Sequence, residues 1–171
     1  MQDFQNYDII KLGFWPGGDR DGNPFVTAKI TEQVADELRI TLMKCYYNEF
    51  KALRRKLTFK GLLAPILELN EGLYRAMFQK NFLLTYPEII GKLEEIKEIL
   101  VNDYHSLYLK ELNALINKVH IFKTHFAVLD IRQDHSKHYA AVEDILKQNR
   151  SIKTSLAVSY THLTLPTIYS V

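Results

Sequence analysis

Apolar side chains recur at intervals of three and four residues through most of the chain, the spacing that places them on one face of a helix. This pattern predicts helices over residues 31–56, 66–82, 87–100, 106–120 and 136–149. Thr31 is expected to cap the first helix, and Pro87 suits the first turn of the third. The expected buried face of the first helix consists of Val34, Leu38, Thr41, Leu42, Cys45, Phe50 and Leu53.

Two short apolar runs, at residues 9–15 and 126–131, do not follow the helical spacing and are typical of strands. Two lone strands do not make a stable sheet. We therefore expect them to pair with strands outside this chain, so that the chain is an internal piece of a larger protein. The predicted fold is mainly α, a helical fragment with two short strands.

The last 18 residues, 154–171, contain no Asp, Glu, Lys or Arg and do not continue the preceding helix. The stretch SYTHLTLP at 159–166 resembles translated adapter or vector sequence, so this tail is predicted to be non-native; a short native hairpin or edge segment is the alternative. The expected divisions are a Gly-rich motif with a strand (1–30), a helical segment (31–125), a strand with an Arg-containing motif and a helix (126–153), and this tail (154–171).

Composition narrows the functional class. Hydrophobic residues make up 47% of the 171 residues and charged residues 25%, which is typical of a globular protein. A net charge of +2 argues against a nucleic-acid-binding protein. The single cysteine, Cys45, excludes an intramolecular disulfide and is expected to be an inert buried thiol. With no apolar run long enough for a membrane span and no signal-peptide pattern, a cytoplasmic location without membrane contact is expected.

The first motif that could carry chemistry is WPGGDRDGNP at residues 15–24. Its glycines and prolines impose unusual backbone angles on a stretch rich in charged side chains. A calcium loop is excluded because Pro24 and Ile30 replace the required Gly and Glu, and a P-loop lacks its Lys-Ser/Thr. The motif is either a precisely shaped functional surface or a tight turn in which Asp19 and Asp21 cap amides and Arg20 pairs with a neighbouring acid.

The second motif is DIRQDHSKH at residues 130–138, directly after the second predicted strand. Arg132 has a planar fork of donors that suits a phosphate or carboxylate. The alternative is a structural salt bridge from Arg132 to Asp130 or Asp134. His135 and His138 could share a metal ion, but no third ligand occurs at a recognisable spacing, so metal binding is disfavoured.

Together the two motifs resemble those of the phosphoenolpyruvate carboxylase family. The family carries a stretch like Ser-Trp-Met-Gly-Gly-Asp-Arg-Asp-Gly-Asn-Pro, which residues 14–24 match except at Phe14 and Pro16. It also carries Asp-Ile-Arg-Gln-Glu-Ser followed closely by Arg-His, which residues 130–138 match except at Asp134, His135 and Lys137. The resemblance covers roughly residues 7–153, although the helical stretch between the motifs is shorter than expected for the family.

The resemblance implies a (β/α)8-type barrel embedded in additional helices, which would account for two isolated strands. It implies a cytoplasmic, homotetrameric lyase that converts phosphoenolpyruvate and bicarbonate to oxaloacetate and phosphate with Mg²⁺ or Mn²⁺. Arg132 is expected to bind the substrate phosphate, and Trp15 is expected to form a wall of the carboxylation pocket. The remaining motif residues, expected to support this site, are Gly17, Gly18, Asp19, Arg20, Asp21, Asn23, Asp130, Gln133 and His138.

The family's catalytic histidine motif and its metal-binding carboxylates do not occur in this sequence. No catalytic or metal-ligating residue is therefore expected here, and this chain is not expected to turn over substrate without the rest of a parent chain. The alternative from another functional class is a stand-alone helical binding or scaffold domain, in which Arg132 and the Gly-rich turn are purely structural.

Overall fold

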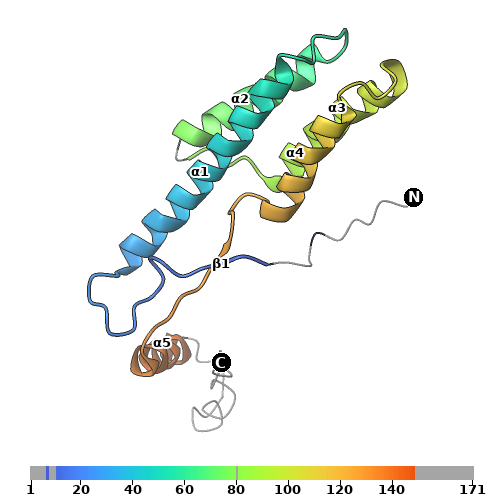
Figure 1. Cartoon of the computed structure of the whole chain (residues 1–171). Coiled ribbons are helices and arrows are strands. Elements are labelled where there is room, and N and C mark those ends of the chain that lie inside the picture. The colour runs from blue at the N-terminus through green and yellow to red at the C-terminus, as the bar shows by residue number, and fades with distance from the viewer. Residues whose placement is uncertain (1–6, 8–10, 80, 149–171) are drawn as a thin grey trace.

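The computed structural model describes residues 7, 11–79 and 81–148 (Figure 1). The predicted tail at 154–171 lies outside these residues. The helices are α1 (Ala28–Arg54), α2 (Leu63–Phe78), α3 (Tyr86–Asp103), α4 (Leu109–Phe122) and α5 (His135–Gln148), and the strands are β1 (Gly13–Phe14) and β2 (Val128–Leu129). The prediction of a mainly helical chain with two short strands is confirmed.

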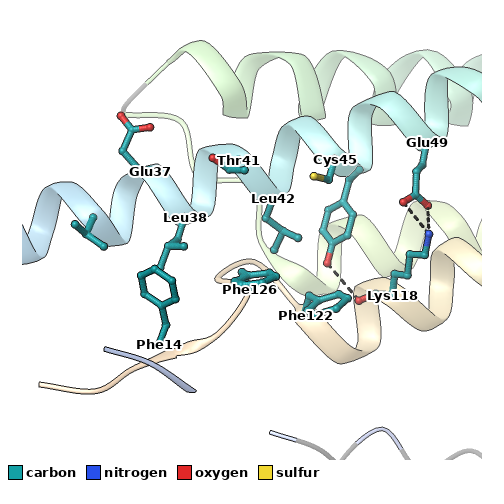
Figure 2. A pocket seen from close by; sticks show the side chains of 12 residues that line it. Phe14, Glu37, Leu38, Thr41, Leu42, Cys45, Glu49, Lys118, Phe122 and Phe126 are labelled. Carbon is teal, nitrogen blue, oxygen red and sulfur yellow. Dashed lines mark hydrogen bonds and ion pairs between the residues drawn. The ribbon is translucent and has the colours of Figure 1, made fainter. Parts of the chain in front are cut away.

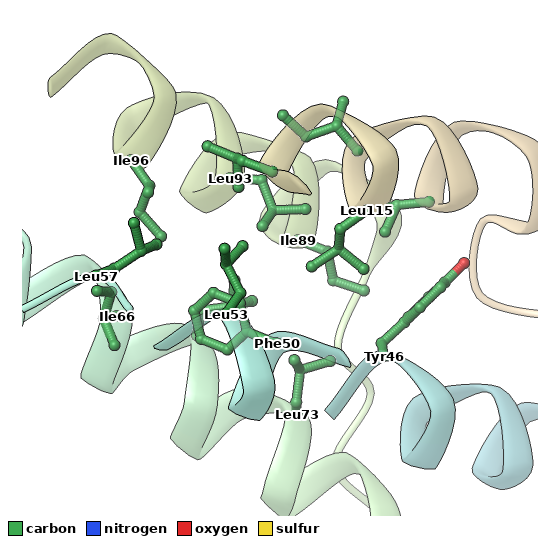
Figure 3. Packing of buried hydrophobic residues seen from close by; sticks show 14 of the residues in the cluster. Tyr46, Phe50, Leu53, Leu57, Ile66, Leu73, Ile89, Leu93, Ile96 and Leu115 are labelled. Carbon is green, nitrogen blue, oxygen red and sulfur yellow. The ribbon is translucent and has the colours of Figure 1, made fainter. Parts of the chain in front are cut away.

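Helices α1 to α4 form the helical body of the described chain, in which α1 lies along α2 and α3 lies along α4 (Figure 1). Apolar side chains from all four helices meet between the two pairs, among them Phe50, Leu73, Leu93 and Leu115 (Figure 3). Each of these is buried, so this interface is the core that the helical spacing predicted. Helix α5 has no buried residue and adds nothing to this core.

The start of α1 differs from the prediction. Thr27, not Thr31, is the N-cap, because the Thr27 hydroxyl accepts a hydrogen bond from the Ile30 backbone N–H at 3.4 Å. Thr31 instead lies in the first turns of α1 and is buried. Pro87 does lie in the first turn of α3, as expected, behind a capping box formed by Thr85 and Glu88. Hydrogen bonds from the Thr85 hydroxyl and backbone N–H lower the pKa of Glu88.

The two strands pair with each other in parallel, with Gly13 opposite Val128 and Phe14 opposite Leu129. The expectation that they pair only outside this chain is therefore wrong. Parallel neighbours need a long crossover connection, and here the whole helical body supplies it. Because four helices separate the two strands in the sequence, the sequence pattern did not indicate that they pair.

The predicted buried face of α1 is only half buried. Leu42, Phe50 and Leu53 are in the core, but Thr41 and Cys45 are exposed. The expectation of a buried Cys45 thiol is wrong because its part of α1 borders an open apolar groove of about 500 Å³ (Figure 2). The groove also includes Phe14, Val34, Leu38, Phe122 and Phe126. No helix in the described part of the chain is both long and apolar enough to span a membrane.

Tyr46 is one of the polar side chains that line this groove. The Tyr46 hydroxyl donates to the backbone carbonyl of Lys123 at 3.0 Å, just beyond the end of α4. Burial, assisted by the nearby negative charge of Glu49, raises the pKa of Tyr46 far above its ordinary value. Tyr46 is therefore a neutral donor that ties α1 to the segment leading into β2.

Candidate functional site

The two motifs meet where the parallel strands end. Trp15 directly follows β1, and Asp130 directly follows β2. The Asp130 backbone N–H donates to the Phe14 carbonyl at 2.8 Å, which brings the ends of the strands into register. Because the carboxyl ends of parallel strands lie at the same edge, residues 15–20 and 130–132 lie together.

Past the strands, the Gly-rich loop, which comprises residues 15–27 between β1 and α1, makes a second set of backbone contacts with the segment around Arg132. The loop first turns, with the Gly18 N–H donating to the Trp15 carbonyl at 2.9 Å. The Arg132 N–H then donates to the Gly18 carbonyl at 2.9 Å, and the Arg20 N–H donates to the Arg132 carbonyl at 2.8 Å. These two hydrogen bonds fix both the backbone N–H and the backbone carbonyl of Arg132. Residues 15–17 form the turn between these bonds and the paired strands.

Glycine is required at two loop positions for different reasons. Gly17 has φ of +80°, and a Cβ there would lie 2.6 Å from the Val34 Cγ2 atom of α1. A Cβ on Gly18 would lie 2.1 Å from the backbone oxygen of Asp130. The first glycine therefore lets the loop lie on α1, and the second lets it lie on the Arg132 segment.

Arg20 joins the loop to α1 through a neutral partner. Its Nη2 and Nε atoms donate to the Thr31 Oγ1 atom at 2.7 and 3.2 Å. The Thr31 hydroxyl in turn donates to the Gly17 carbonyl at 2.7 Å. Among the described residues no carboxylate forms an ion pair with Arg20, so the alternative in which Arg20 pairs with a neighbouring acid is wrong.

Arg132 lies at the surface, with 57% of its side chain exposed. Its Nε atom lies 3.0 Å from the Asp130 Oδ2 atom, so the salt bridge considered from the sequence does form. An ion pair this exposed contributes little to stability. Within the described part of the chain, the two terminal nitrogens of Arg132 make no hydrogen bond, which leaves the end of the guanidinium open. Trp15 is also 57% exposed, at the same edge of the strands.

The other motif residues shape the surroundings. Asn23 accepts a hydrogen bond from the Phe25 N–H at 3.1 Å and so closes the loop, while Asp21 is exposed within it. Gln133 accepts from the Asp134 N–H at 3.1 Å. His138 lies exposed in the first turn of α5. The structure thus brings residues 15–20 together with Asp130 and Arg132. Among the described residues, Asp21, Asn23 and His138 form no hydrogen bond or ion pair with Arg132.

Asp134 lies just before α5 and forms hydrogen bonds with the first turn of that helix instead of an ion pair with Arg132. Its Oδ1 atom accepts hydrogen bonds from the hydroxyl and from the backbone N–H of Ser136, the second at 2.8 Å. These bonds lower the pKa of the Asp134 carboxyl, so it is a stable anion at the helix N-terminus. Arg132 therefore has Asp130, not Asp134, as its carboxylate neighbour.

The described residues do not form a metal site. No group of three or more His, Cys, Asp and Glu residues among them could hold a metal ion. His135 lies 3.7 Å from the Asp134 carboxylate and is largely exposed.

Reasoning from sequence missed Thr31 and Val34 as parts of this site. Both lie on α1 and contact the Gly-rich loop at Gly17. Thr31 donates a hydrogen bond to the Gly17 carbonyl, and the Val34 side chain packs closely against Gly17. The sequence does not indicate these contacts, because a threonine and a valine are ordinary residues in the first turns of a helix. Only the packing of α1 against the loop shows their role.

Comparison with known proteins gives a consistent result. The family model described as phosphoenolpyruvate carboxylase matches residues 1–73 and 67–163, so its second range ends within the segment 154–171. A phosphoenolpyruvate carboxylase of Shewanella sediminis is 29% identical over an alignment of 168 residues, gaps included, and the match covers 81% of this chain and 19% of that protein. One from Aeromonas salmonicida is 27% identical over an alignment of 158 residues, gaps included, and the match covers 75% of this chain and 18% of that protein.

A phosphoenolpyruvate carboxylase of Haemophilus influenzae is 26% identical over an alignment of 193 residues, gaps included, and the match covers 85% of this chain and 21% of that protein. The chain thus spans about a fifth of the length of the curated relatives that it matches. The matched ranges include both motifs and the helical body that joins them. The chain belongs to the phosphoenolpyruvate carboxylase family.

Proposed function

We propose that this chain is part of a phosphoenolpyruvate carboxylase, a lyase that forms oxaloacetate and phosphate from phosphoenolpyruvate and bicarbonate. The observation that carries the proposal is the fixed backbone of Arg132. Its N–H and carbonyl are both held by the Gly-rich loop at the carboxyl edge of two parallel strands, while the end of its side chain remains open. This combination suits the binding of an anionic substrate group.

The reaction places specific demands on such a site. An oxygen of bicarbonate attacks phosphorus, the bond between phosphorus and the enol oxygen breaks, and carboxyphosphate and the enolate of pyruvate result. Carboxyphosphate then releases carbon dioxide and phosphate, and the enolate carbon forms the new carbon–carbon bond. Anionic intermediates of this kind need fixed cations and protection from water. Arg132 is proposed to bind the phosphate group, and Trp15 to shield the enolate and carbon dioxide.

Among the described residues, no group of three or more His, Cys, Asp and Glu side chains could hold the Mg²⁺ or Mn²⁺ that the family implies. We therefore place the metal ligands, like the catalytic histidine, in the rest of a longer parent chain. The proposal includes a cytoplasmic homotetramer for that parent. None of the roles given to Arg132 and Trp15 depends on where the metal binds.

The first test is Arg132→Lys in the full-length protein that contains this chain. Lysine keeps the charge but loses the planar fork, so we expect kcat/KM for phosphoenolpyruvate to fall by the equivalent of about 1.5 to 3 kcal/mol. The dependence on bicarbonate should change less. Arg55→Lys, at an exposed position in the connection after α1, is the matched control and should leave both unchanged.

Two results would count against the proposal. If Arg132 serves only as the salt-bridge partner of Asp130, the substitution will leave the kinetics nearly intact, with at most a small change in melting temperature because the pair is exposed. If the unmodified full-length protein forms no oxaloacetate from the two substrates, the proposed activity itself is wrong. Initial rates and a thermal melt of the same preparations separate these results.

The second test concerns Trp15. Without the indole, water should reach the reactive intermediates, so Trp15→Ala in the full-length protein is expected to raise the ratio of phosphate released to oxaloacetate formed. Phe25→Ala removes an aromatic side chain of the same loop that is 85% exposed, and it is the control. An unchanged ratio in a normally folded Trp15→Ala protein would show that Trp15 does not line the pocket.

A further inference from the structure

Thr31 occupies an unusual position for a hydroxyl side chain. It is buried, with 7% of its surface exposed, although it lies near the start of α1 and close to the Gly-rich loop. Its single hydroxyl accepts two hydrogen bonds from the Arg20 guanidinium and donates to the Gly17 carbonyl. The same oxygen therefore binds the loop at two points, one on each side of Gly18.

These contacts continue to Arg132. The backbone N–H of Arg20, the residue whose side chain Thr31 holds, donates to the Arg132 carbonyl at 2.8 Å. The carbonyl of Gly18, which directly follows the other point held by Thr31, accepts from the Arg132 N–H at 2.9 Å. Hydrogen bonds linked by short stretches of the loop backbone thus connect α1 to the backbone of Arg132 on both sides. Trp15 lies two residues before Gly17, one of the two loop residues that Thr31 contacts.

We propose that Thr31 is a positioning residue for substrate binding: its hydroxyl fixes the Gly-rich loop on α1 and thereby sets the positions of Arg132 and Trp15. The inference rests on the proposed function of those two residues. It differs from a capping role, because Thr27 already caps α1.

The hydroxyl, rather than the bulk of the side chain, is required. Valine has nearly the same shape as threonine but neither donates nor accepts a hydrogen bond, so Thr31→Val would leave the Gly17 carbonyl and the Arg20 guanidinium without this partner. Serine keeps the hydroxyl and loses only a methyl group. A pair of variants at one position therefore separates hydrogen bonding from packing.

The experiment compares Thr31→Val, Thr31→Ser and the control Thr41→Val in the full-length protein. Thr41 lies on the same helix and is exposed, so its substitution should leave the kinetics unchanged. For Thr31→Val we expect kcat/KM for phosphoenolpyruvate to fall at least about tenfold and the ratio of phosphate to oxaloacetate to rise. Thr31→Ser should recover kcat/KM to within about threefold of the unmodified enzyme.

The product ratio distinguishes positioning from a general loss of stability, which would reduce the amount of active enzyme without changing its products. A Thr31→Val protein with a lower melting temperature but unchanged kcat/KM and product ratio would overturn the inference. So would a Thr31→Ser protein as impaired as Thr31→Val. If the unmodified protein makes no oxaloacetate, the proposed function fails first, and this inference fails with it.

Arg20→Lys provides a second measurement if Thr31→Val does not fold. Lysine keeps the positive charge but cannot place two donors on the Thr31 oxygen at once. We expect kcat/KM for phosphoenolpyruvate to fall about threefold or more, with the same rise in the product ratio. Unchanged kinetics and product ratio in a folded Arg20→Lys protein would overturn the inference.

Discussion

At the scale of single residues, Gly18 is the position at which the residue type most strictly limits the geometry of the site. Gly18 is buried between the turn that begins at Trp15 and the backbone of Asp130, and no space remains for a side chain. The neighbouring Gly13 is the opposite case, because a Cβ added there meets nothing within 4 Å. The two glycines lie in the same short stretch, yet only one is required by packing.

We therefore predict that Gly18→Ala in the full-length protein lowers oxaloacetate formation about a hundredfold, because the loop must move away from the Arg132 segment and small displacements of binding groups have effects of this size. Gly13→Ala should stay within about threefold of the unmodified protein. Initial rates of purified proteins measure both. Equal loss in the two variants would show that the close approach at Gly18 is not what positions Arg132.

At the scale of secondary-structure elements, α3 has favourable residues at its start and on its buried face, but it also contains a glycine that lowers its stability. Helix α3 begins with a capping box and a proline in its first turn, and Leu93, Ile96 and Leu100 are buried on one face. Gly91 lies on its exposed side, where a Cβ would meet nothing within 4 Å. Glycine within a helix is unfavourable because it loses more backbone freedom on folding than alanine does.

Gly91→Ala is accordingly expected to raise the free energy of unfolding of the 171-residue chain by about 0.5 to 1 kcal/mol. Gly72→Ala in α2 is the control, since its Cβ would lie 3.3 Å from the Leu84 Cδ1 atom and must displace it. Its gain should be smaller or absent. Urea denaturation followed by circular dichroism measures both, and a gain in Gly72→Ala that equals that in Gly91→Ala would contradict this account.

At the scale of the whole molecule, stability is concentrated in the helical body. The core cluster comes from α1 to α4 and the connections between α1 and α2. The strands have only each other within the described chain, and α5 has no buried residue. A pair of short strands contributes little stability without a third strand or a covering helix. Arg132 and Trp15, which follow the strands, therefore lie in the part of the described chain that we expect to be least stable.

Hydrogen exchange of the 171-residue chain should reveal this difference. Backbone amides of Asp130 and Arg132 are hydrogen bonded, yet we expect them to exchange at least about a hundredfold faster than amides of Phe50 or Leu93, because local opening of the strands leaves the core intact. Exchange measured by mass spectrometry on peptides from each region tests this. Equal protection of both regions would show that the strands unfold only together with the helical body.

Much of the fold and part of the site follow from sequence alone. Helical spacing determines which faces are apolar, so the helices and most core positions, such as Phe50 and Leu53, were predictable. The two motifs were also recognisable, because glycine and proline restrict the backbone through their own covalent structure. Such signals are local: each depends on residues within a few turns of one another.

The tertiary structure alone decided which partners these local elements have. It paired β1 with β2 across the entire helical body, gave Arg20 the Thr31 hydroxyl instead of a carboxylate, and left Cys45 beside an open groove. In each case the deciding contact joins segments whose approach depends on how the helices pack, and no periodicity or composition encodes that approach. Sequence therefore determined the elements and the motifs, whereas packing determined which atoms hold Arg132 in place.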